Sequence, residues 1–150
     1  PPRSTLFPYT TLFRSREAEV AINNILGRKD RMRYQAMPSV IYTNPEMSFV
    51  GETEESCREK GLNYKKVTLP MTYSGRYMAE NEGGEGLIKM LIDKDSERIL
   101  GCHMIGSYAS EIILAAGFLV ETEMRLQDIK EFVFPHPTVG EIIREAVFHA

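Results

Sequence analysis

The sequence predicts an α+β fold, an antiparallel sheet of about five strands with helices packed mainly on one face. Short runs rich in β-branched and apolar residues fill the middle of the chain and are joined by turn-like segments, as antiparallel strands are. Helical patterns dominate the last third, so strands and helices fall into separate layers. The length of 150 residues, with 43% hydrophobic and 26% charged residues, is enough for one core but leaves little room for two.

The first predicted element is a helix that begins at Arg16. Residues 1–15 carry three prolines and no acidic residue, show no helical or strand period, and look like translated linker sequence. From Arg16 onward apolar side chains recur on one helical face, and Gly27 is a typical helix end. The members of that face are Ala18, Ala21, Ile22, Ile25 and Leu26.

Two strands and a short helix come next. Residues 39–43 and 47–50 are β-rich, and Pro45 breaks them apart because proline cannot donate a hydrogen bond to a sheet. Thr53 can then cap a helix with acidic residues in its first turn, which ends near Gly61.

The sheet continues with three more predicted strands. Residues 64–71 have strand character, whereas 72–85 are polar and contain glycine, which predicts a loop. The paired glycines of that loop suit a turn better than a phosphate-binding cradle. Segments 87–93 and 98–105 flank a polar turn at 94–97, the pattern of a hairpin.

Helices close the chain. The apolar stretch 112–120 predicts a long helix, and 126–132 predicts a shorter one. The first stretch is far shorter than the roughly twenty residues that span a bilayer, so we expect no membrane segment. The predicted core face of the long helix consists of Ala109, Ile112, Ile113, Ala116, Gly117 and Val120.

The cysteines and the other histidines offer no metal or redox motif. Cys57 and Cys102 have no cysteine near them, so we expect packed or surface thiols in a protein of the reducing cytoplasm. His103 is expected to be half-buried and satisfied by a neighbour, and His149 lies near the chain end. A formal charge of -3 gives no reason to expect nucleic-acid binding.

The strongest functional clue is His136-Pro137-Thr138-Val139-Gly140-Glu141. Histidine can act as a general base, and a carboxylate on one ring nitrogen fixes the tautomer and raises the basicity of the other. The same spacing forms a capping box in which Thr138 caps the last helix and Glu141 bonds back to the Thr138 amide. Spacing alone favours the cap, but one carboxylate has lone pairs for both partners.

Longer motifs around this stretch favour a catalytic role over a helix cap alone. Residues 134–146 resemble the C-terminal signature of the pyridine nucleotide-disulfide oxidoreductases, and their Arg-Glu-Ala ending is most similar to the dihydrolipoyl dehydrogenase branch of that family. Residues 37–51 resemble the entry into the family's dimerisation domain, and 86–90 with 99–106 resemble its central strand pair. The resemblance runs from about Arg16 to Ala150, with its motifs in family order.

This resemblance implies roles for the site. His136 is implied to be the catalytic acid/base for thiol-disulfide exchange, and Glu141 to orient it. A cis peptide bond is expected between His136 and Pro137, with Asn44-Pro45 as a second candidate. The family acts as a homodimer, so His136 and Pro137 are expected beside the flavin of the partner subunit. The same resemblance makes Glu111 a candidate for contact with that subunit. The implied reaction uses FAD and NAD to oxidise the dihydrolipoyl arm of a 2-oxo acid dehydrogenase or glycine cleavage system.

The resemblance also implies that the chain is a fragment. We expect 1–15 to be a non-native leader, 16–33 to hold the last helix of a truncated FAD-binding domain with its linker, and 34–150 to be the dimerisation domain without its final tail. The flavin fingerprint, nicotinamide domain and redox cysteines are absent from these 150 residues. The chain by itself is therefore expected to bind no cofactor and to catalyse nothing.

Two alternatives remain open. The complete protein could be another disulfide reductase of the family, acting on glutathione or a related thiol. The chain could also be a stand-alone dimerisation module without catalysis, if no flavin domain is encoded upstream of Arg16.

Overall fold

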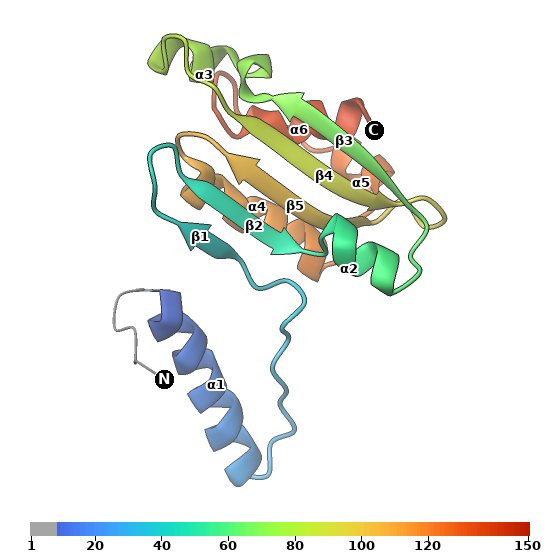
Figure 1. Ribbon diagram of the computed structural model, residues 1–150. Helices are drawn as coiled ribbons and strands as arrows, with labels where there is room; N and C mark the ends of the chain where they lie inside the picture. The colour runs from blue at the N-terminus through green and yellow to red at the C-terminus, as the bar shows by residue number, and fades with distance from the viewer. Residues whose placement is uncertain (1–8) are drawn as a thin grey trace. The chain divides into compact units, whose positions relative to one another are not determined.

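The structure of the protein is a computed structural model that describes residues 9–150. It consists of two compact units, one ending at Tyr34 and the other spanning Gln35–Ala150 (Figure 1).

The first unit contains helix α1 (Tyr9–Ile25). Its end agrees with the sequence: Gly27 has a φ of 75°, and the amides of Gly27 and Arg28 donate to the carbonyls of Asn24 and Asn23. The start of the helix differs from the prediction, because α1 begins at Tyr9, inside the segment where we expected no helix. Once a helical turn exists, each added residue gains a hydrogen bond, so a helix can extend past its amphipathic part. The predicted apolar face is exposed, with Ile25 at 78%.

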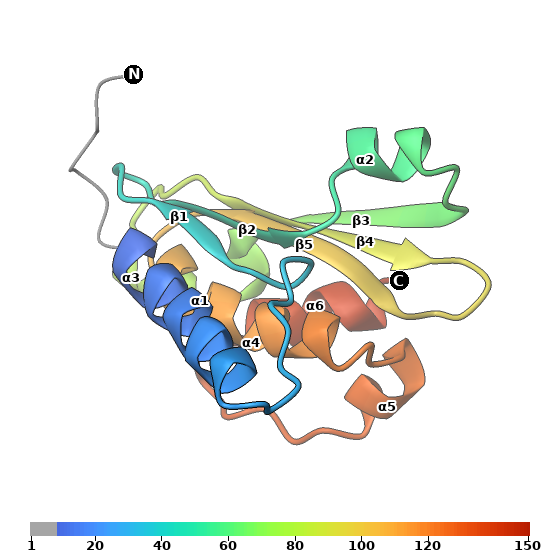
Figure 2. The same cartoon turned by 90° about the horizontal axis from the view of Figure 1, so that it is seen from below.

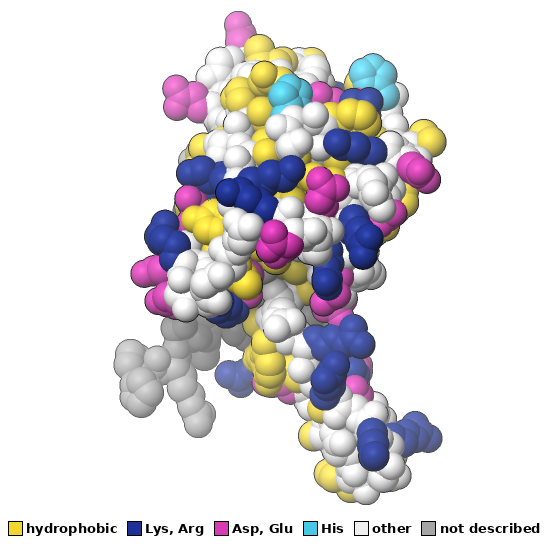
Figure 3. All heavy atoms as spheres, turned by 90° about the vertical axis from the view of Figure 1, so that its right-hand side faces the viewer, with side chains coloured by type: hydrophobic (Ala, Val, Ile, Leu, Met, Phe, Trp, Pro, Cys, Tyr) yellow, Lys and Arg dark blue, Asp and Glu magenta, His cyan; other side chains and the backbone are white. Residues whose placement is uncertain are grey.

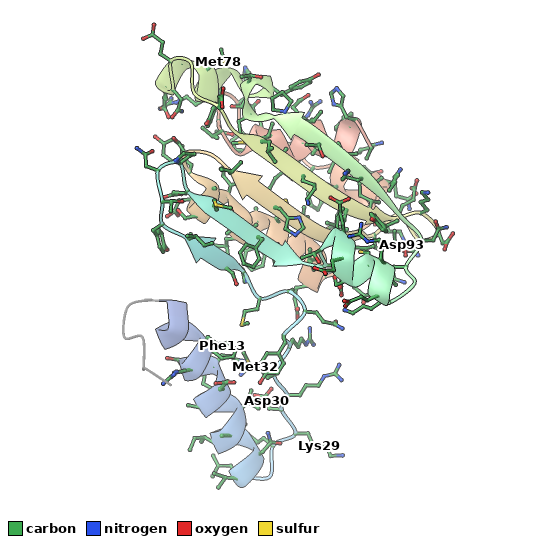
Figure 4. All side chains as sticks on the ribbon, viewed as in Figure 1. Phe13, Lys29, Asp30, Met32, Met78 and Asp93 are labelled. Carbon is green, nitrogen blue, oxygen red and sulfur yellow. The ribbon has the colours of Figure 1, made fainter. Side chains whose placement is uncertain are left out.

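The second unit is built on a five-stranded antiparallel sheet in the order β1-β2-β5-β4-β3 (Figure 1). This sheet confirms the predicted α+β class, and each strand begins and ends within two residues of its prediction. The strands are β1 (Ser39–Ile41), β2 (Met47–Gly51), β3 (Tyr64–Pro70), β4 (Leu87–Asp93) and β5 (Ile99–Ile105). Asp93, labelled in Figure 4, shapes the turn after β4, because its Oδ1 accepts hydrogen bonds from the amides of Asp95 and Ser96.

Three helices cover one face of the sheet: α4 (Ala109–Glu121), α5 (Leu126–Lys130) and α6 (Glu141–Phe148). Figure 2 shows them on one side and α2 (Glu54–Glu59) on the other. The core fills the space between the sheet and the helices. One row of core side chains consists of residues that pair with one another across four neighbouring strands. That row is Val50, Cys102, Met90 and Val67. Helix α6 faces it with Ile142, Ile143, Ala146 and Val147.

Helix α2 begins as predicted. Thr53 Oγ1 accepts from the Ser56 amide at 3.1 Å, and Ser56 Oγ accepts from the Thr53 amide at 2.9 Å. Glu54 then forms ion pairs with Lys66 and Lys89, which tie the helix to β3 and β4.

The predicted loop at 72–85 is partly wrong. It contains a 3₁₀ turn, Met71–Tyr73, and a helix, α3 (Gly75–Glu80). Ser74 caps this helix by accepting from the Tyr77 amide at 3.1 Å, and the Tyr77 side chain is buried. A single buried residue in a polar segment gives no periodic signal, so only packing reveals the helix.

His103 is half-buried, but the expectation that a neighbour satisfies it is wrong. Both ring nitrogens are buried and have no hydrogen-bond partner among the described residues. Its register partners on either side are Phe49, which offers no polar side-chain group, and Lys89, whose ammonium donates to Glu54 at 3.0 Å. Burial, and secondarily the charge of Lys89, lower the pKa of His103 against the opposing effect of Glu54.

Cys57 and Cys102 are both free and buried, as expected for packed thiols. Burial raises the pKa of Cys102 to about 12, which keeps it protonated and unreactive. Acidic and basic side chains are interspersed over the surface shown in Figure 3. Within the described part of the chain, no helix has the length and apolar character needed to cross a membrane.

Candidate active site

His136 and Glu141 are in direct contact. The Nδ1 atom of His136 lies 2.5 Å from Oε1 of Glu141, and the preceding turn contains a cis peptide bond between His136 and Pro137. The cis bond at Asn44-Pro45 is also present. The imidazole is 80% exposed, whereas the Glu141 side chain is only 15% exposed. The pair therefore consists of a nearly buried carboxylate that holds a histidine projecting into solvent.

Glu141 has two partners, one for each oxygen. Its Oε2 accepts from the Thr138 amide at 2.8 Å while Oε1 meets the histidine. Burial by itself raises the pKa of Glu141, but the hydrogen bonds from Thr138 and His136 outweigh it and hold that pKa below its ordinary value. The carboxylate thus stays ionised at neutral pH and can stabilise a protonated imidazole.

The predicted capping box is half right. Glu141 does bond back to the Thr138 amide, but the Thr138 hydroxyl donates to the Pro135 carbonyl at 2.8 Å and caps no helix. Gly140 occupies the N-cap position of α6 and has no side chain for the role. Thr138 therefore closes the turn through its bond to Pro135 instead of capping the helix.

Packing of α6 fixes the carboxylate. Glu141 is the first residue of a helix whose next two side chains, Ile142 and Ile143, are buried in the core. Val139, on the turn before it, is also buried. The helix cannot rotate without exposing these residues, so Glu141 is presented at a defined position next to the histidine.

The geometry suits a proton acceptor directed outward. With Nδ1 engaged by a carboxylate, the neutral ring carries its proton on Nδ1 and leaves the lone pair on Nε2. No residue in the described chain hydrogen-bonds Nε2. The arrangement can therefore accept a proton from a group supplied from outside this unit.

The other candidates lie elsewhere. Cys57 is in α2 on the opposite face of the sheet, and Cys102 and His103 are in β5. His149 follows α6, where its Nδ1 contacts the Glu145 carbonyl. Residues 9–150 contain no group of three His, Cys, Asp or Glu side chains arranged to hold a metal ion. Glu111 is exposed on α4. Its side chain is therefore accessible to a second subunit.

Sequence reasoning missed one polar residue that touches this turn. Ser74, buried at 1% exposure, donates from its hydroxyl to the Thr138 carbonyl at 3.0 Å. The sequence signal for Ser74 as a helix cap is present, but nothing local indicates a contact 64 positions away. A surface cavity of about 390 Å³ lies beside the same turn, lined by Pro137–Gly140 and residues of α3 and α4.

Known proteins are similar to this chain in sequence and in fold. Residues 37–147 match the family described as pyridine nucleotide-disulphide oxidoreductase, dimerisation domain. Dihydrolipoyl dehydrogenase of Haemophilus influenzae is 37% identical over 127 residues, covering 85% of this chain and 26% of the relative. The human mitochondrial dihydrolipoyl dehydrogenase is 34% identical over 130 residues, covering 87% of this chain and 25% of the relative. The chain thus spans about a quarter of the length of these relatives.

Solved structures give the same fold. LpdA from Mycobacterium tuberculosis superposes with a TM-score of 0.80 at 20% identity, covering 89% of this chain and 29% of that protein. The HOCl-induced flavoprotein disulfide reductase RclA from Escherichia coli has a TM-score of 0.79 at 24% identity, covering 89% and 31%. With the family match over residues 37–147, the chain belongs to the pyridine nucleotide-disulphide oxidoreductase family, as its dimerisation domain.

Proposed function

We propose that this chain is the dimerisation domain of an NAD-dependent dihydrolipoyl dehydrogenase and supplies His136 and Glu141 as the acid/base pair for dithiol oxidation. The observation that carries the proposal is the contact between His136 Nδ1 and the ionised Glu141, which leaves Nε2 directed outward on an exposed ring. Dihydrolipoyl dehydrogenases of bacteria and animals are the relatives at 34–37% identity that support this branch of the family.

In this proposal His136 moves a proton at Nε2. It accepts the proton of one thiol of the dihydrolipoyl substrate, so that the resulting thiolate attacks the enzyme's redox disulfide. Glu141 holds the ring in the tautomer that leaves Nε2 free and stabilises the imidazolium that forms. Thr138 holds Glu141 through its amide at 2.8 Å.

The two cofactors and the redox disulfide are assigned to the rest of the complete protein. FAD, when bound, would supply the redox chemistry that links the dithiol to NAD. The 80% exposure of His136 fits a group that reaches a site formed largely by another chain, because a base that served its own domain would be enclosed there. Flavin contact is therefore assigned to His136 and Pro137 of one subunit next to the flavin of the other.

A homodimer is the expected assembly. Helix α4 presents Leu114 and Phe118 to solvent at 54% and 61% exposure, although its opposite face is buried on the sheet. These apolar side chains, with Glu111 on the same helix, offer a surface to a second copy. A lipoyl-bearing protein is the proposed partner that delivers the substrate, and the reducing cytoplasm is the proposed setting.

Mixed dimers of the complete protein test this proposal. One subunit carries His136→Gln and the other lacks its redox cysteines, so each parent dimer has lost one half of every site. The His136→Gln subunit keeps its disulfide and receives an intact histidine from its partner, so one working site per hybrid dimer should appear. Hybrids as inactive as their parents, after verified subunit exchange, would show that His136 does not act across the interface.

Two other functions give different results with the same preparation. A glutathione-type reductase would reduce glutathione disulfide and leave dihydrolipoamide unoxidised. A non-catalytic dimerisation module would show neither reaction and no flavin spectrum.

A further inference from the structure

Ser74 stands apart from the other polar residues of the unit. Apart from tyrosine and cysteine, the described chain buries only two polar residues, Ser48 at 2% and Ser74 at 1% exposure. Ser48 donates to the Ala109 carbonyl and ties β2 to α4. Ser74 sits at the start of α3, far from the histidine turn in sequence, yet its hydroxyl contacts that turn directly.

The Ser74 hydroxyl has one proton, and its two neighbours determine which of them receives the hydrogen bond that it donates. The Tyr77 amide is a donor 3.1 Å away, so Ser74 must accept from it. The single O–H is then free to donate to the Thr138 carbonyl at 3.0 Å. The oxygen is buried, so water competes poorly for either bond, and the hydroxyl is fixed in one orientation.

Thr138 links this contact to Glu141. Its carbonyl is held by Ser74, its amide by Glu141 Oε2, and its own hydroxyl bonds the Pro135 carbonyl. Displacing Thr138 would therefore move the amide away from the carboxylate. The carboxylate would then lose one of the two hydrogen bonds that set its position against His136.

We propose that Ser74 is a positioning residue for the His136–Glu141 pair: it anchors Thr138, whose amide in turn fixes the carboxylate. The inference rests on the proposed function for its catalytic consequence. It goes beyond that function because Ser74 touches neither the histidine nor the carboxylate and belongs to a different element.

The competing reading is that Ser74 is only the cap of α3. Substitutions separate the two roles, because glycine is tolerated at an N-cap with a loss of a few tenths of a kcal/mol, whereas alanine costs about 1 kcal/mol. Ser74→Ala and Ser74→Gly both remove the donor to Thr138, but only the first weakens the cap strongly. Ser74→Thr keeps a hydroxyl for both bonds. Thr53→Ala is the matched control, since it removes the cap of α2 on the opposite face of the sheet.

The first readout is the carboxyl titration of Glu141, followed by NMR in the 150-residue chain. Glu141 should titrate closer to the ordinary pKa of glutamate in both Ser74→Ala and Ser74→Gly, because its carboxylate loses the fixed Thr138 amide. Ser74→Thr and Thr53→Ala should titrate as the parent chain does. A shift that appears with Ser74→Ala but not with Ser74→Gly would mean that Ser74 acts only as a cap and would overturn the proposal.

The second readout is turnover of dihydrolipoamide by the complete enzyme. Ser74→Ala and Ser74→Gly should each lower kcat by about tenfold, within the roughly 10²-fold that a misplacement of 1 Å can cost. KM for NAD should stay unchanged, and Ser74→Thr should restore most of kcat. Parent-like kcat in both variants, in an enzyme that His136→Gln inactivates, would overturn the positioning role alone. An enzyme that His136→Gln leaves fully active would overturn the proposed function instead.

Discussion

Glu141 divides its two oxygens between His136 and the Thr138 amide, and this division predicts what an amide in its place would do. The Thr138 amide requires an acceptor, so the oxygen of a glutamine at this position should turn toward Thr138. Its NH₂ group would then face Nδ1 of His136 and donate to it. The ring proton would move to Nε2, which could no longer accept a proton from substrate.

We therefore predict that Glu141→Gln costs about 10²–10⁴-fold in turnover of the complete enzyme, while the unfolding free energy falls by only about 1 kcal/mol. Nitrogen-15 NMR of the His136 ring should show the proton on Nδ1 in the parent and on Nε2 in the variant. A variant with unchanged tautomer and rate but reduced stability would show that Glu141 serves only the start of the helix.

His103 predicts a dependence of stability on pH. Its pKa is lowered in the folded state, mainly by burial, so below about pH 6.5 the unfolded chain binds more protons than the folded one. Stability contributed by neutral His103 is present above that pH and is lost as the pH falls toward the folded pKa. His103→Leu should show a shallower fall in unfolding free energy between pH 7 and pH 5 in urea titrations. Parallel curves for variant and parent would contradict this assignment.

At the scale of elements, the junction of β2 and β5 depends on close backbone approach. A Cβ added at Gly101 would lie 2.1 Å from the Glu52 carbonyl oxygen, and one at Gly51 would lie 2.3 Å from the Leu100 carbonyl oxygen. Both obstacles are backbone atoms, one in β5 and one directly after β2, and neither can move aside as the end of a flexible side chain can. Gly75, at the start of α3, has nothing within 4 Å of such an atom.

We predict that Gly101→Ala destabilises the unit by about 1–3 kcal/mol or more. Gly75→Ala should be neutral or stabilise it by about 0.4–1 kcal/mol, since alanine restricts the unfolded chain and fits the helix. Thermal unfolding of the two variants beside the parent measures the contrast. Equal melting temperatures for the pair would contradict the close approach of β5 to Glu52.

Helix α3 is an element that sequence periodicity does not predict. Strands and longer helices were predicted from alternation and from apolar faces that repeat over several turns. The six residues of α3 bury only Tyr77, and the apolar Met78 beside it is 47% exposed. A helix with one buried residue is stabilised by its cap and by the surface it packs on, and neither is a periodic property of the sequence.

For the whole molecule, the core lies entirely within one unit. Every buried hydrophobic residue of the cluster falls between Val50 and Val147. A chain that begins at Gln35 should therefore fold and melt within a few degrees of the 150-residue chain. Circular dichroism on heating tests this. A trimmed chain without cooperative unfolding would show that residues before Gln35 are needed for the sheet to form.

The 150-residue chain by itself should not oxidise dihydrolipoamide or bind FAD stoichiometrically. Its site, in the proposal, needs groups held by the rest of the complete protein and by a second subunit. Activity assays and flavin titration followed by gel filtration check this outcome. Turnover by the purified chain would refute the assignment of those groups to other segments.

The sequence by itself determined the strand order along the chain, the cap at Thr53, the end of α1 at Gly27 and the choice of His136 and Glu141. These features depend on interactions between residues a few positions apart or on repeats within one element, so the local spacing of residues is enough to predict them. The role of the site came from a resemblance that no physical pattern could supply.

Tertiary structure alone decided the rest. It left the His103 nitrogens without partners among the described residues and brought Ser74 to a carbonyl 64 residues away. Each depends on which side chains meet when the sheet and helices pack. Because hydrogen bonds require directed contact within about 3 Å, a short spacing in sequence cannot establish them across elements.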